Sequence, residues 1–557
     1  MTRAVPPTDS PSQRCTITGA RLVNADGSLT DLLDIGIDQG AIASIEPTRT
    51  RRPRGAVIEA NGRLALPGFI DAHVHGEAVV TSPDVQLAML RQGVTTVVLG
   101  QDGVSFAPSP AGTDTAAWAG RYFAAVNGAH PDFSTGGVAD LLATYDHATA
   151  LNVGYLAPAG TIRYAVMGTE NRAADEDERT AMKALLSAAL DEGACGVSTG
   201  LEYLPGGYAT TGELIDLTSV VAARGLPHVS HMRGYDEAAL PALDELFQIA
   251  AASGVATHVS HLHGDPEAII ASLDGAITRG LDVTFDTYPY GRGCSILAIF
   301  ALPGWLPSAD PDATIAALGE AETAQRVITE HLAGLDGMWH LVTLAAAPTD
   351  DGDDLGWVEG LALPEVATRM NLTPAQTVLE LLTRTRLRVT CIFARGHEVE
   401  YGELIHHPGH MAGSDAIYFG SYPHPRGWGA FAKFLREQVL QTGRWTWPHA
   451  IWHLSTAAAR RFGLVGRGQI DIGAAADIAL LDPESVSDVA TYDDPRRPAT
   501  GINDVLVRGV QVLAGGELTG ALPGGGIRPE HHVGPEHPVG PEHPVGSKQR
   551  ENSEVAP

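Results

Sequence analysis

Short apolar runs alternate with amphipathic segments through the middle of the chain, from about residue 67 to 464. The candidate strands read GFIDAHVH, VTTVVLG, NVGYLAP, CGVSTG, LPHVSH, VATHVSH, DVTFDTY, VTCIFA and HMAGSD. Alternation of strands and helices is typical of βαβ units and a parallel sheet. Eight such strands would close a (β/α)8 barrel, so one candidate must lie elsewhere. We exclude VTCIFA (389–394), because it follows an excursion from about 296 to 390 that is too long for a plain loop.

The two ends of the chain have a different pattern, with short alternating runs separated by glycine-containing turns. This texture covers residues 15–66 and returns over 465–528. It is typical of antiparallel β structure and predicts one small β-sandwich domain built from both termini. The predicted fold class is therefore α/β: a TIM barrel over 67–464, that β-sandwich, and an inserted subdomain at about 296–390. Residues 1–14 and the VGPEHP repeats of 529–557 have little apolar content, so we expect both to be disordered.

Composition excludes several classes of partner. The formal net charge of −29 repels nucleic acid and anionic membrane, so neither is an expected partner. The four cysteines show no C-x-x-C spacing, which argues against a disulfide scaffold and a four-thiolate zinc site. We find no signal-like segment and no apolar run near the ~20 residues of a membrane helix, and expect a cytoplasmic protein. The sequence leaves the oligomeric state open.

Histidines stand at the predicted carboxyl ends of several strands. His73 and His75 are two residues apart, which places both side chains on one face of a strand. In a parallel barrel this end of the strands carries the active site. On its own, H-x-H is a short pattern that also fits two hydrogen-bonded polar residues.

The tetrapeptide HVSH occurs at 228–231 and again at 258–261, an offset of about one βα unit. Histidines three apart point to opposite faces of a strand, so only one of each pair can face the barrel mouth. His231 and His261 are nearest the strand ends and are the candidates. We expect His228 and His258 to pack or hydrogen-bond inside the fold.

Asp415 ends the last candidate strand, in HMAGSDA. A lone aspartate there is usually a cap or turn residue. Beside four strand-end histidines it completes a set of neutral imidazoles and carboxylate typical of a catalytic zinc-like site.

These residues resemble the amidohydrolase superfamily and, more narrowly, the D-aminoacylases (N-acyl-D-amino-acid deacylases). The motifs that carry the resemblance are GFIDAHVH, STGLEYLP (198–205), VSHMR (229–233), VSHL (259–262), DTYPY (286–290), GSD (413–415), HPRGWGAF (424–431) and GRGQIDIGAAADIALLDP (466–483). The resemblance spans about 15 to 520. It implies a metal-dependent barrel in which His231 and His261 hold the tightly bound zinc. His73 and His75 would hold a second, weaker metal, and Asp415 would bind the attacking water and take its proton.

The sequence departs from the family at three places. Asp102, in Gly-Gln-Asp-Gly, stands where the family has a metal-ligating cysteine, so a carboxylate that can bridge two metals replaces a softer thiolate. The alternative is that Asp102 caps a turn. His263 replaces a family lysine near the substrate carboxylate, and the family's acidic pair after H-x-H is here Gly76 and Glu77.

The resemblance also implies substrate contacts. Arg426, in the HPR motif, matches an arginine that grips the substrate α-carboxylate, for which a planar guanidinium is well suited. Tyr288 and His263 are further candidates, and Ser295 is a weaker one because GRGCS does not align cleanly.

We therefore expect hydrolysis of a linear amide in a small carboxylate-bearing molecule, an N-acyl-D-amino acid or a dipeptide ending in a D residue. The chirality comes from the resemblance alone. One alternative is a cyclic amidase of the hydantoinase or dihydroorotase kind, but such enzymes usually need a bridging lysine, and the strand candidates at 153–158 and 194–199 contain none. Another is a non-catalytic barrel scaffold, which the retained histidines and Asp415 argue against.

Overall fold

The structure is a computed structural model that describes residues 14–350, 355–394 and 401–530. We expected residues 1–14 and 529–557 to be disordered, and most of these residues lie outside the described ranges. The exceptions are Arg14, which begins a strand, and residues 529 and 530. Among the helices in the described ranges, none combines the length and apolar character needed to cross a membrane.

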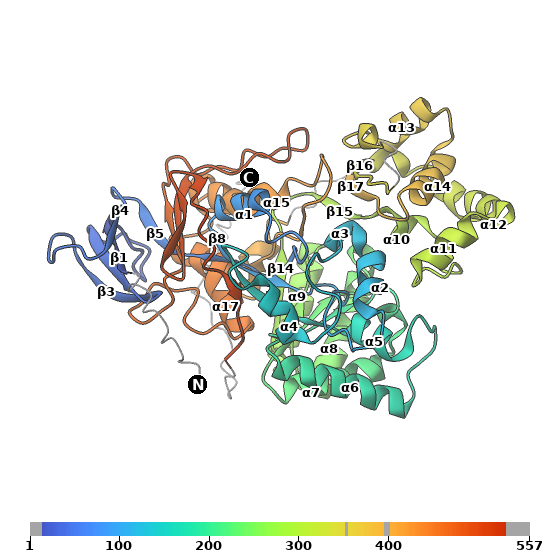
Figure 1. Cartoon of the computed structure of the whole chain (residues 1–557), viewed down its shortest axis with the longest axis horizontal. Coiled ribbons are helices and arrows are strands. Elements are labelled where there is room, and N and C mark those ends of the chain that lie inside the picture. The colour runs from blue at the N-terminus through green and yellow to red at the C-terminus, as the bar shows by residue number, and fades with distance from the viewer. Residues whose placement is uncertain (1–13, 351–354, 395–400, 531–557) are drawn as a thin grey trace, which may run out of the picture.

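Parallel strands lie in the middle of the molecule (Figure 1), and their pairing order makes a ring. Its strands are β6 (Phe69–Asp71), β7 (Val74–His75), β8 (Val94–Leu99), β9 (Asn152–Tyr155), β10 (Ala157–Pro158), β11 (Val197–Gly200), β12 (Pro227–His231), β13 (Ala256–Val259), β14 (Val283–Thr287), β18 (His410–Ala412) and β19 (Ala416–Ile417). They pair in parallel as β6-β8-β9, then β10 through β14 to β18, then β19-β7. The segments 69–75, 152–158 and 410–417 each carry two short strands, so they join these three sheets into one ring. The predicted barrel is confirmed.

The barrel strands consist mainly of apolar, small or β-branched residues, and helices cover them. Every residue of β8, VTTVVL, is buried, as expected for a parallel strand enclosed on both faces. The surrounding helices are α1 (Pro83–Leu90), α2 (Thr115–Tyr122), α3 (Ala124–Asn127), α4 (Val138–Tyr145), α5 (Ala159–Met167), α6 (Glu176–Asp191), α7 (Thr211–Ala222), α8 (Ala239–Ser253), α9 (Pro266–Thr278), α15 (Arg426–Phe434), α16 (Trp447–Ile451) and α17 (Ala457–Arg461). A capping box of Asp175 and Glu178 begins α6.

The long excursion after β14 forms a separate small subdomain, coloured green to yellow in Figure 1. It contains β15 (Arg292–Ile296), α10 (Leu297–Ala301), α11 (Pro311–Leu318), α12 (Ala321–Arg326), β16 (Val342–Ala346), α13 (Leu363–Met370), α14 (Pro374–Arg384) and β17 (Thr390–Ala394). The antiparallel sheet β15-β17-β16 and a hydrophobic cluster of its own hold it together. VTCIFA supplies β17, so its exclusion from the barrel is confirmed.

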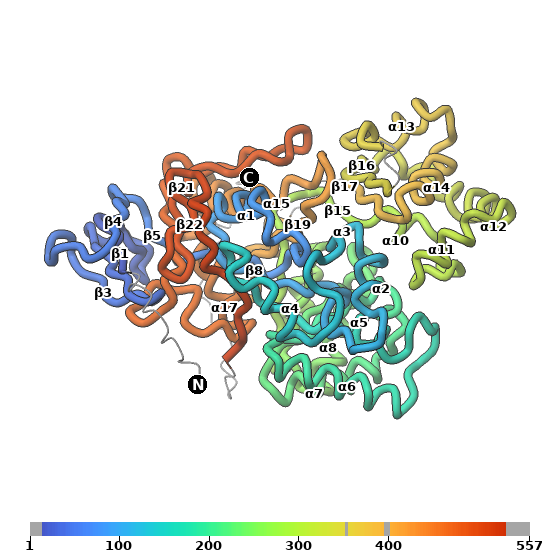
Figure 2. The backbone as a smooth tube through the Cα atoms, in the orientation of Figure 1, coloured from blue at the N-terminus to red at the C-terminus, as the bar shows by residue number. Residues whose placement is uncertain are grey.

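Both ends of the chain build the β layers on the side of the barrel opposite the inserted subdomain, where the blue and red parts of the tube run side by side (Figure 2). One sheet has the order β3-β2-β1-β4 and the other β23-β22-β21-β20-β5. Their strands are β1 (Arg14–Ala20), β2 (Leu33–Asp38), β3 (Ala41–Pro47), β4 (Ala56–Glu59), β5 (Leu64–Pro67), β20 (Ile478–Leu481), β21 (Ile502–Val507), β22 (Val510–Ala514) and β23 (Glu517–Leu518). Ile17 and Ile37 from the first sheet share one buried cluster with Ile478 and Leu506 from the second. Beyond them, β24 (Gly525–Gly526) pairs with β9 of the barrel.

Candidate metal centre and substrate cavity

Six polar side chains converge at the carboxyl ends of the barrel strands. His75 ends β7 and His231 ends β12, while His73 lies between β6 and β7. The other three, His261, Asp102 and Asp415, follow β13, β8 and β18. All six are buried. The sequence predicted this set, and the structure brings all of it together.

Asp102 lies at the centre of the four histidines. Its Oδ1 is 3.6 Å from Nε2 of His73 and 3.8 Å from Nε2 of His261. Its Oδ2 is 3.5 Å from Nε2 of His75 and 3.8 Å from Nδ1 of His231. Each carboxylate oxygen therefore faces two imidazoles, an arrangement that allows one carboxylate to serve two neighbouring cation positions.

Asp415 approaches the same cluster from the other side. Its Oδ1 lies 3.8 Å from Nε2 of His73 and 3.6 Å from Nε2 of His75. Two overlapping groups of three donors have the spacing of a metal site: His73, His75 and Asp415, and His73, Asp102 and His261.

The donor set fits a divalent metal. Imidazole–carboxylate distances of 3.5–3.8 Å are too long for hydrogen bonds, yet two donors about 2.0–2.2 Å from a common ion stand roughly 3–4 Å apart. Nδ1 and Nε2 of His73 and Oδ1 of Asp102 are buried without a hydrogen-bond partner in the described structure. Because buried polar atoms are normally satisfied, these atoms fit a divalent cation as their partner.

Three of the six residues have left-handed backbone conformations. The φ angles are +58° at Asp102, +35° at His261 and +48° at Asp415. Residues other than glycine rarely adopt such φ angles, and those that do are commonly found at functional sites. The backbone is thus bent to direct these side chains inward just after the strands end.

A buried carboxylate, Asp286 at the end of β14, holds two of the histidine positions. Its Oδ1 accepts the backbone N–H of His261 at 2.9 Å, and its Oδ2 is 3.6 Å from Nδ1 of His73. His258 lies 2.9 Å from the same Oδ2, so it hydrogen-bonds inside the fold as expected. His228 likewise bonds the Thr199 hydroxyl at 2.7 Å.

The sequence reasoning missed two side chains that fix the histidine rings. Oε2 of Glu202 is 2.8 Å from Nε2 of His231, which leaves Nδ1 of that ring facing Asp102. Oδ1 of Asn127 is 3.0 Å from Nδ1 of His75. Such outer partners fix the tautomer and orientation of metal-binding histidines. Glu202 lies inside the quoted motif STGLEYLP, which was a usable signal, whereas nothing in the sequence singles out Asn127.

Glu77, which follows the H-x-H pair, is buried and connects the loops around the site; it also accepts from Nδ2 of Asn127 at 3.4 Å. Its carboxylate accepts the backbone N–H of Gly100 at 3.0 Å and the Ser105 hydroxyl at 2.9 Å. It thereby ties the loop after β7 to the loop that carries Asp102.

Opposite charges dominate the electrostatics of the cluster. Burial alone would raise the pKa of Asp102, but the surrounding histidines, His73 foremost, hold it well below its usual range. Burial alone would lower the pKa of His75, but Asp102 and Asp415 raise it to about 10. The carboxylates therefore favour positive charge at the centre, as a metal site requires.

A cavity of about 340 Å³ opens beside the cluster. His75, Asp102, His231, His261 and Asp415 form one part of its lining. The inserted subdomain contributes another part through Ser295 and neighbouring residues of β15 and β17. Small-molecule sites are typically concavities of this kind, mostly apolar with a few convergent polar groups.

The predicted substrate residues lie in two different environments. Tyr288, His263 and Ser295 line the cavity. Arg426, at the start of α15, is fully buried behind it, with its guanidinium 4.6 Å above the ring of Tyr288. Nη1 of Arg426 lies 2.8 Å from Oδ2 of Asp415, so the two form a buried ion pair. The sequence did not predict this pairing.

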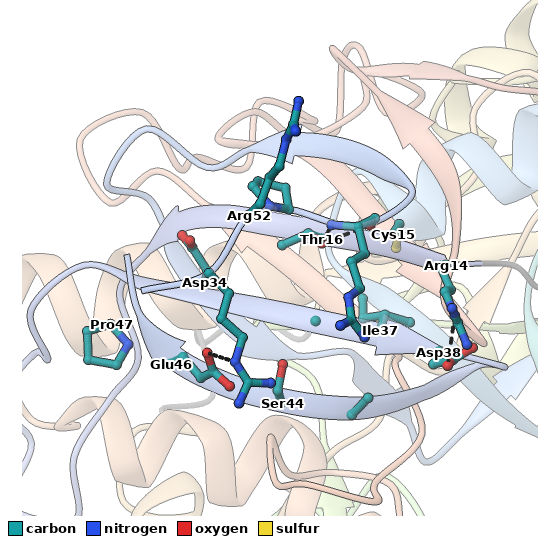
Figure 3. A pocket seen from close by; sticks show the side chains of 15 residues that line it. Arg14, Cys15, Thr16, Asp34, Ile37, Asp38, Ser44, Glu46, Pro47 and Arg52 are labelled. Atoms are coloured by element: carbon teal, nitrogen blue, oxygen red, sulfur yellow. Dashed lines mark hydrogen bonds and ion pairs between the residues drawn. The ribbon is translucent and has the colours of Figure 1, made fainter. Parts of the chain in front are cut away.

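A second pocket lies far from this chemistry, on the sheet β3-β2-β1-β4 (Figure 3). It has a volume of about 100 Å³, and two ion pairs lie among its lining side chains. Arg14 contacts Asp38 at 3.0 Å, and Arg51 contacts Glu46 at 3.2 Å. The described part of its lining contains no histidine.

Comparison with known proteins agrees with this geometry. Residues 56–513 match the amidohydrolase family. The chain is 31% identical over 509 residues to the N-acyl-D-glutamate deacylase of Alcaligenes xylosoxydans xylosoxydans, covering 89% of this chain and 93% of that protein. It is 29% identical over 517 residues to the D-aminoacylase of the same organism, covering 90% and 95%.

A solved structure shows the same architecture. The crystal structure of N-acyl-D-glutamate deacylase from Bordetella bronchiseptica, complexed with zinc and a phosphonate mimic of the tetrahedral intermediate, superposes with a TM-score of 0.75. The two are 29% identical, and the match covers 92% of this chain and 99% of that one. The fold, the converging donors and the extent of the family match together show that the chain belongs to the amidohydrolase family.

Proposed function

We propose that this chain is a zinc-dependent deacylase that hydrolyses the amide bond of N-acyl-D-amino acids to a carboxylate and a free D-amino acid. The observation that carries the proposal is the convergence of four histidines and Asp415 around Asp102, beside one cavity. The D configuration is supported by the names of the deacylase and aminoacylase relatives.

The donor set would serve two metal positions, and Asp102 would be a donor to both. His231 and His261 would hold the tightly bound zinc, and His73 and His75 would hold a second divalent metal. Bound zinc would act as a Lewis acid toward the amide carbonyl and would make water more acidic. Glu202 keeps Nδ1 of His231 directed into the site by occupying the other ring nitrogen.

Asp415 is the proposed general base. Its Oδ2 is engaged by Arg426, which leaves Oδ1 directed toward the donor cluster. Oδ1 takes a proton from water as the water oxygen bonds to the carbonyl carbon. The same proton then passes to the amide nitrogen as the C–N bond breaks, so the leaving group departs as a neutral amine.

The substrate carboxylate would be held by residues at the edge of the cavity. Nε and Nη2 of Arg426 are buried without a hydrogen-bond partner in the described structure, and a carboxylate would satisfy them. Because the guanidinium stacks on Tyr288, which lines the cavity, Tyr288 would border the bound carboxylate. His263 and Ser295 complete the proposed contacts. Fixing the carboxylate orients the amide toward Asp415.

The test is a comparison of N-acetyl-D- and N-acetyl-L-amino acids over a panel of side chains, with release of the free amino group as the readout. The purified protein, assayed with zinc, should hydrolyse the D forms and leave the L forms intact. Hydrolysis of the L forms alone, or ring opening of dihydrouracil without deacylation, would refute the proposal.

A further inference from the structure

A tyrosine lies against the two histidines that are the proposed ligands of the tightly bound zinc. Tyr235 follows β12 in the chain and lines the cavity beside the donor cluster. His231 ends β12 and His261 follows β13, and these two strands pair in parallel. Nδ1 of His231 is 3.0 Å from Nε2 of His261, so the two nitrogens are close enough to bind one ion. Zinc binding therefore depends on the relative orientation of these two imidazoles.

The hydroxyl of Tyr235 ties the two strand ends together. It accepts the backbone N–H of Met232, the residue after His231, at 3.0 Å. It donates to the backbone carbonyl of Ser260, the residue before His261, at 3.2 Å. One phenol thus fixes the backbone beside each histidine, and a shift of one strand end relative to the other would break one of these hydrogen bonds.

The ring of Tyr235 also contacts both imidazoles directly. Its centroid is 5.1 Å from that of His231, edge to face, and 5.0 Å from that of His261. The ring of His263 stacks on it at 4.6 Å, with an interplanar angle of 10°. Tyr203 contacts the His231 ring as well, at 4.6 Å, whereas Tyr235 spans both imidazoles. Because aromatic pairs at such separations have preferred orientations, the Tyr235 ring restricts rotation of both imidazoles.

We infer that Tyr235 is a positioning residue for the metal centre, which holds His231 and His261 in the orientation that directs their nitrogens to one zinc ion. The inference rests on the proposed zinc-dependent function. Tyr235 is not itself assigned as a ligand, because its hydroxyl is engaged by two backbone groups. Ligands that are held in place before the ion arrives lose less freedom when it binds, so the contribution of Tyr235 should be measurable as zinc affinity.

The test measures the zinc dissociation constant of the metal-free protein by titration against a competing chelator. Tyr235→Phe keeps the ring and removes both hydrogen bonds of the hydroxyl, so zinc affinity should fall about tenfold. Tyr235→Leu also removes the ring, and affinity should fall about 100-fold. The visible absorption of bound cobalt(II), which depends on the geometry of its ligands, should change in both variants.

Tyr155→Phe is the matched control. The hydroxyl of Tyr155 likewise accepts one backbone N–H, from Ala107 at 3.1 Å, and donates to one backbone carbonyl, that of the same residue, at 3.0 Å. Tyr155 ends β9, which pairs with β8 and β24 rather than with the strands of the two histidines. Loss of its two hydrogen bonds should therefore leave zinc affinity close to that of wild type.

Equal zinc affinity in Tyr235→Phe and Tyr155→Phe would overturn the inference and leave the proposed function intact. This comparison decides even if Tyr235→Leu does not fold, and circular dichroism of the metal-free proteins checks folding. If the wild-type protein binds no zinc, the proposed function fails and the inference fails with it.

Discussion

At the scale of single residues, the centre of the site is a carboxylate with two separated oxygens. Each oxygen of Asp102 faces two histidines at 3.5–3.8 Å. A thiolate at this place would present one sulfur atom, whereas a carboxylate can bind two cations through different oxygens and prefers harder ions. Asp102 is therefore expected to govern how many metal ions the protein holds.

Substitution of Asp102 tests this role. Asp102→Ala should lower the zinc content of the purified protein by about one equivalent, because a ligand common to both positions is lost. Asp236→Ala is the matched control: Asp236 also lines the cavity but lies outside the donor groups, so zinc content should not change. Metal content is measured by elemental analysis after dialysis. An unchanged value in Asp102→Ala would make Asp102 a turn residue only.

The sequence predicted the histidines better than the residues that orient them. His231 and His261 could be chosen because strand parity and the 30-residue offset of HVSH restrict which imidazoles face the barrel mouth. Glu202 could not be assigned in that way, because its role depends on which nitrogen of His231 it reaches. The burial of Arg426 against Asp415 also depends on tertiary packing between α15 and the loop after β18.

At the scale of elements, the strand segment 410–417 is interrupted so that Asp415 can reach the cluster. Gly413 lies in the gap between β18 and β19. A Cβ at this position would stand 2.6 Å from Oδ1 of Asp286 and 2.8 Å from Cβ of His73. Glycine is thus required by close approach of neighbouring strands, and the apolar pattern alone did not predict the interruption.

Gly413→Ala should therefore disturb the site more than the fold. The added methyl group must displace His73 or Asp286, so we expect kcat/KM for an N-acetyl-D-amino acid to fall about 100-fold, the scale of a misplacement near 1 Å. Gly304→Ala is the control, because a Cβ there meets no atom within 4 Å. Circular dichroism checks that both variants fold. Unchanged kcat/KM in Gly413→Ala would show that this contact does not set the position of His73.

The barrel could be predicted from the sequence because the alternation of strands and helices is a local property of the sequence. Exclusion of VTCIFA followed from the length of the preceding excursion, and β17 indeed pairs antiparallel within the inserted subdomain. The splitting of 69–75 into β6 and β7 was not predictable, because it arises from the bend that directs His73 inward.

At the scale of the whole molecule, the net charge of the protein has the same sign as the charge of the proposed substrate. The net charge of −29 is spread over the chain, whereas the proposed substrate is an anion. Local positive charge from metal and Arg426 would have to attract the substrate against the field of the protein. Added salt screens that field, so salt is a useful control when KM values are compared.

Buried neutral histidines should make stability depend on pH. Burial lowers the pKa of His410 to about 3, below its ordinary value of 6.5. The unfolded chain therefore takes up a proton below pH 6.5 that the folded protein does not, so stability is lost as pH falls from 6.5 toward 3. His410 contributes about 2 kcal/mol to the loss of folding free energy between pH 7 and pH 5.

His410→Gln should remove this part of the pH dependence. Urea unfolding of both proteins at pH 7 and pH 5 gives the measurement, and the loss of unfolding free energy on acidification should be smaller in the variant. Nδ1 of His453 lies 3.2 Å from Nδ1 of His410, so losing this contact could itself change stability. His453→Gln removes the same contact but keeps His410, and it is therefore measured alongside. The same acid-induced loss in wild type and His410→Gln would contradict the account.

The most direct test of the central claim is reconstitution of activity with metal in wild type and in Asp415→Asn. Chelator-treated wild-type protein should release no D-amino acid from an N-acetyl-D-amino acid, and added zinc should restore turnover. Asp415→Asn should bind zinc near the wild-type level, because the histidines and Asp102 remain, yet its kcat should be about 100- to 10,000-fold lower. Full activity after chelation, or wild-type kcat in Asp415→Asn, would contradict the account.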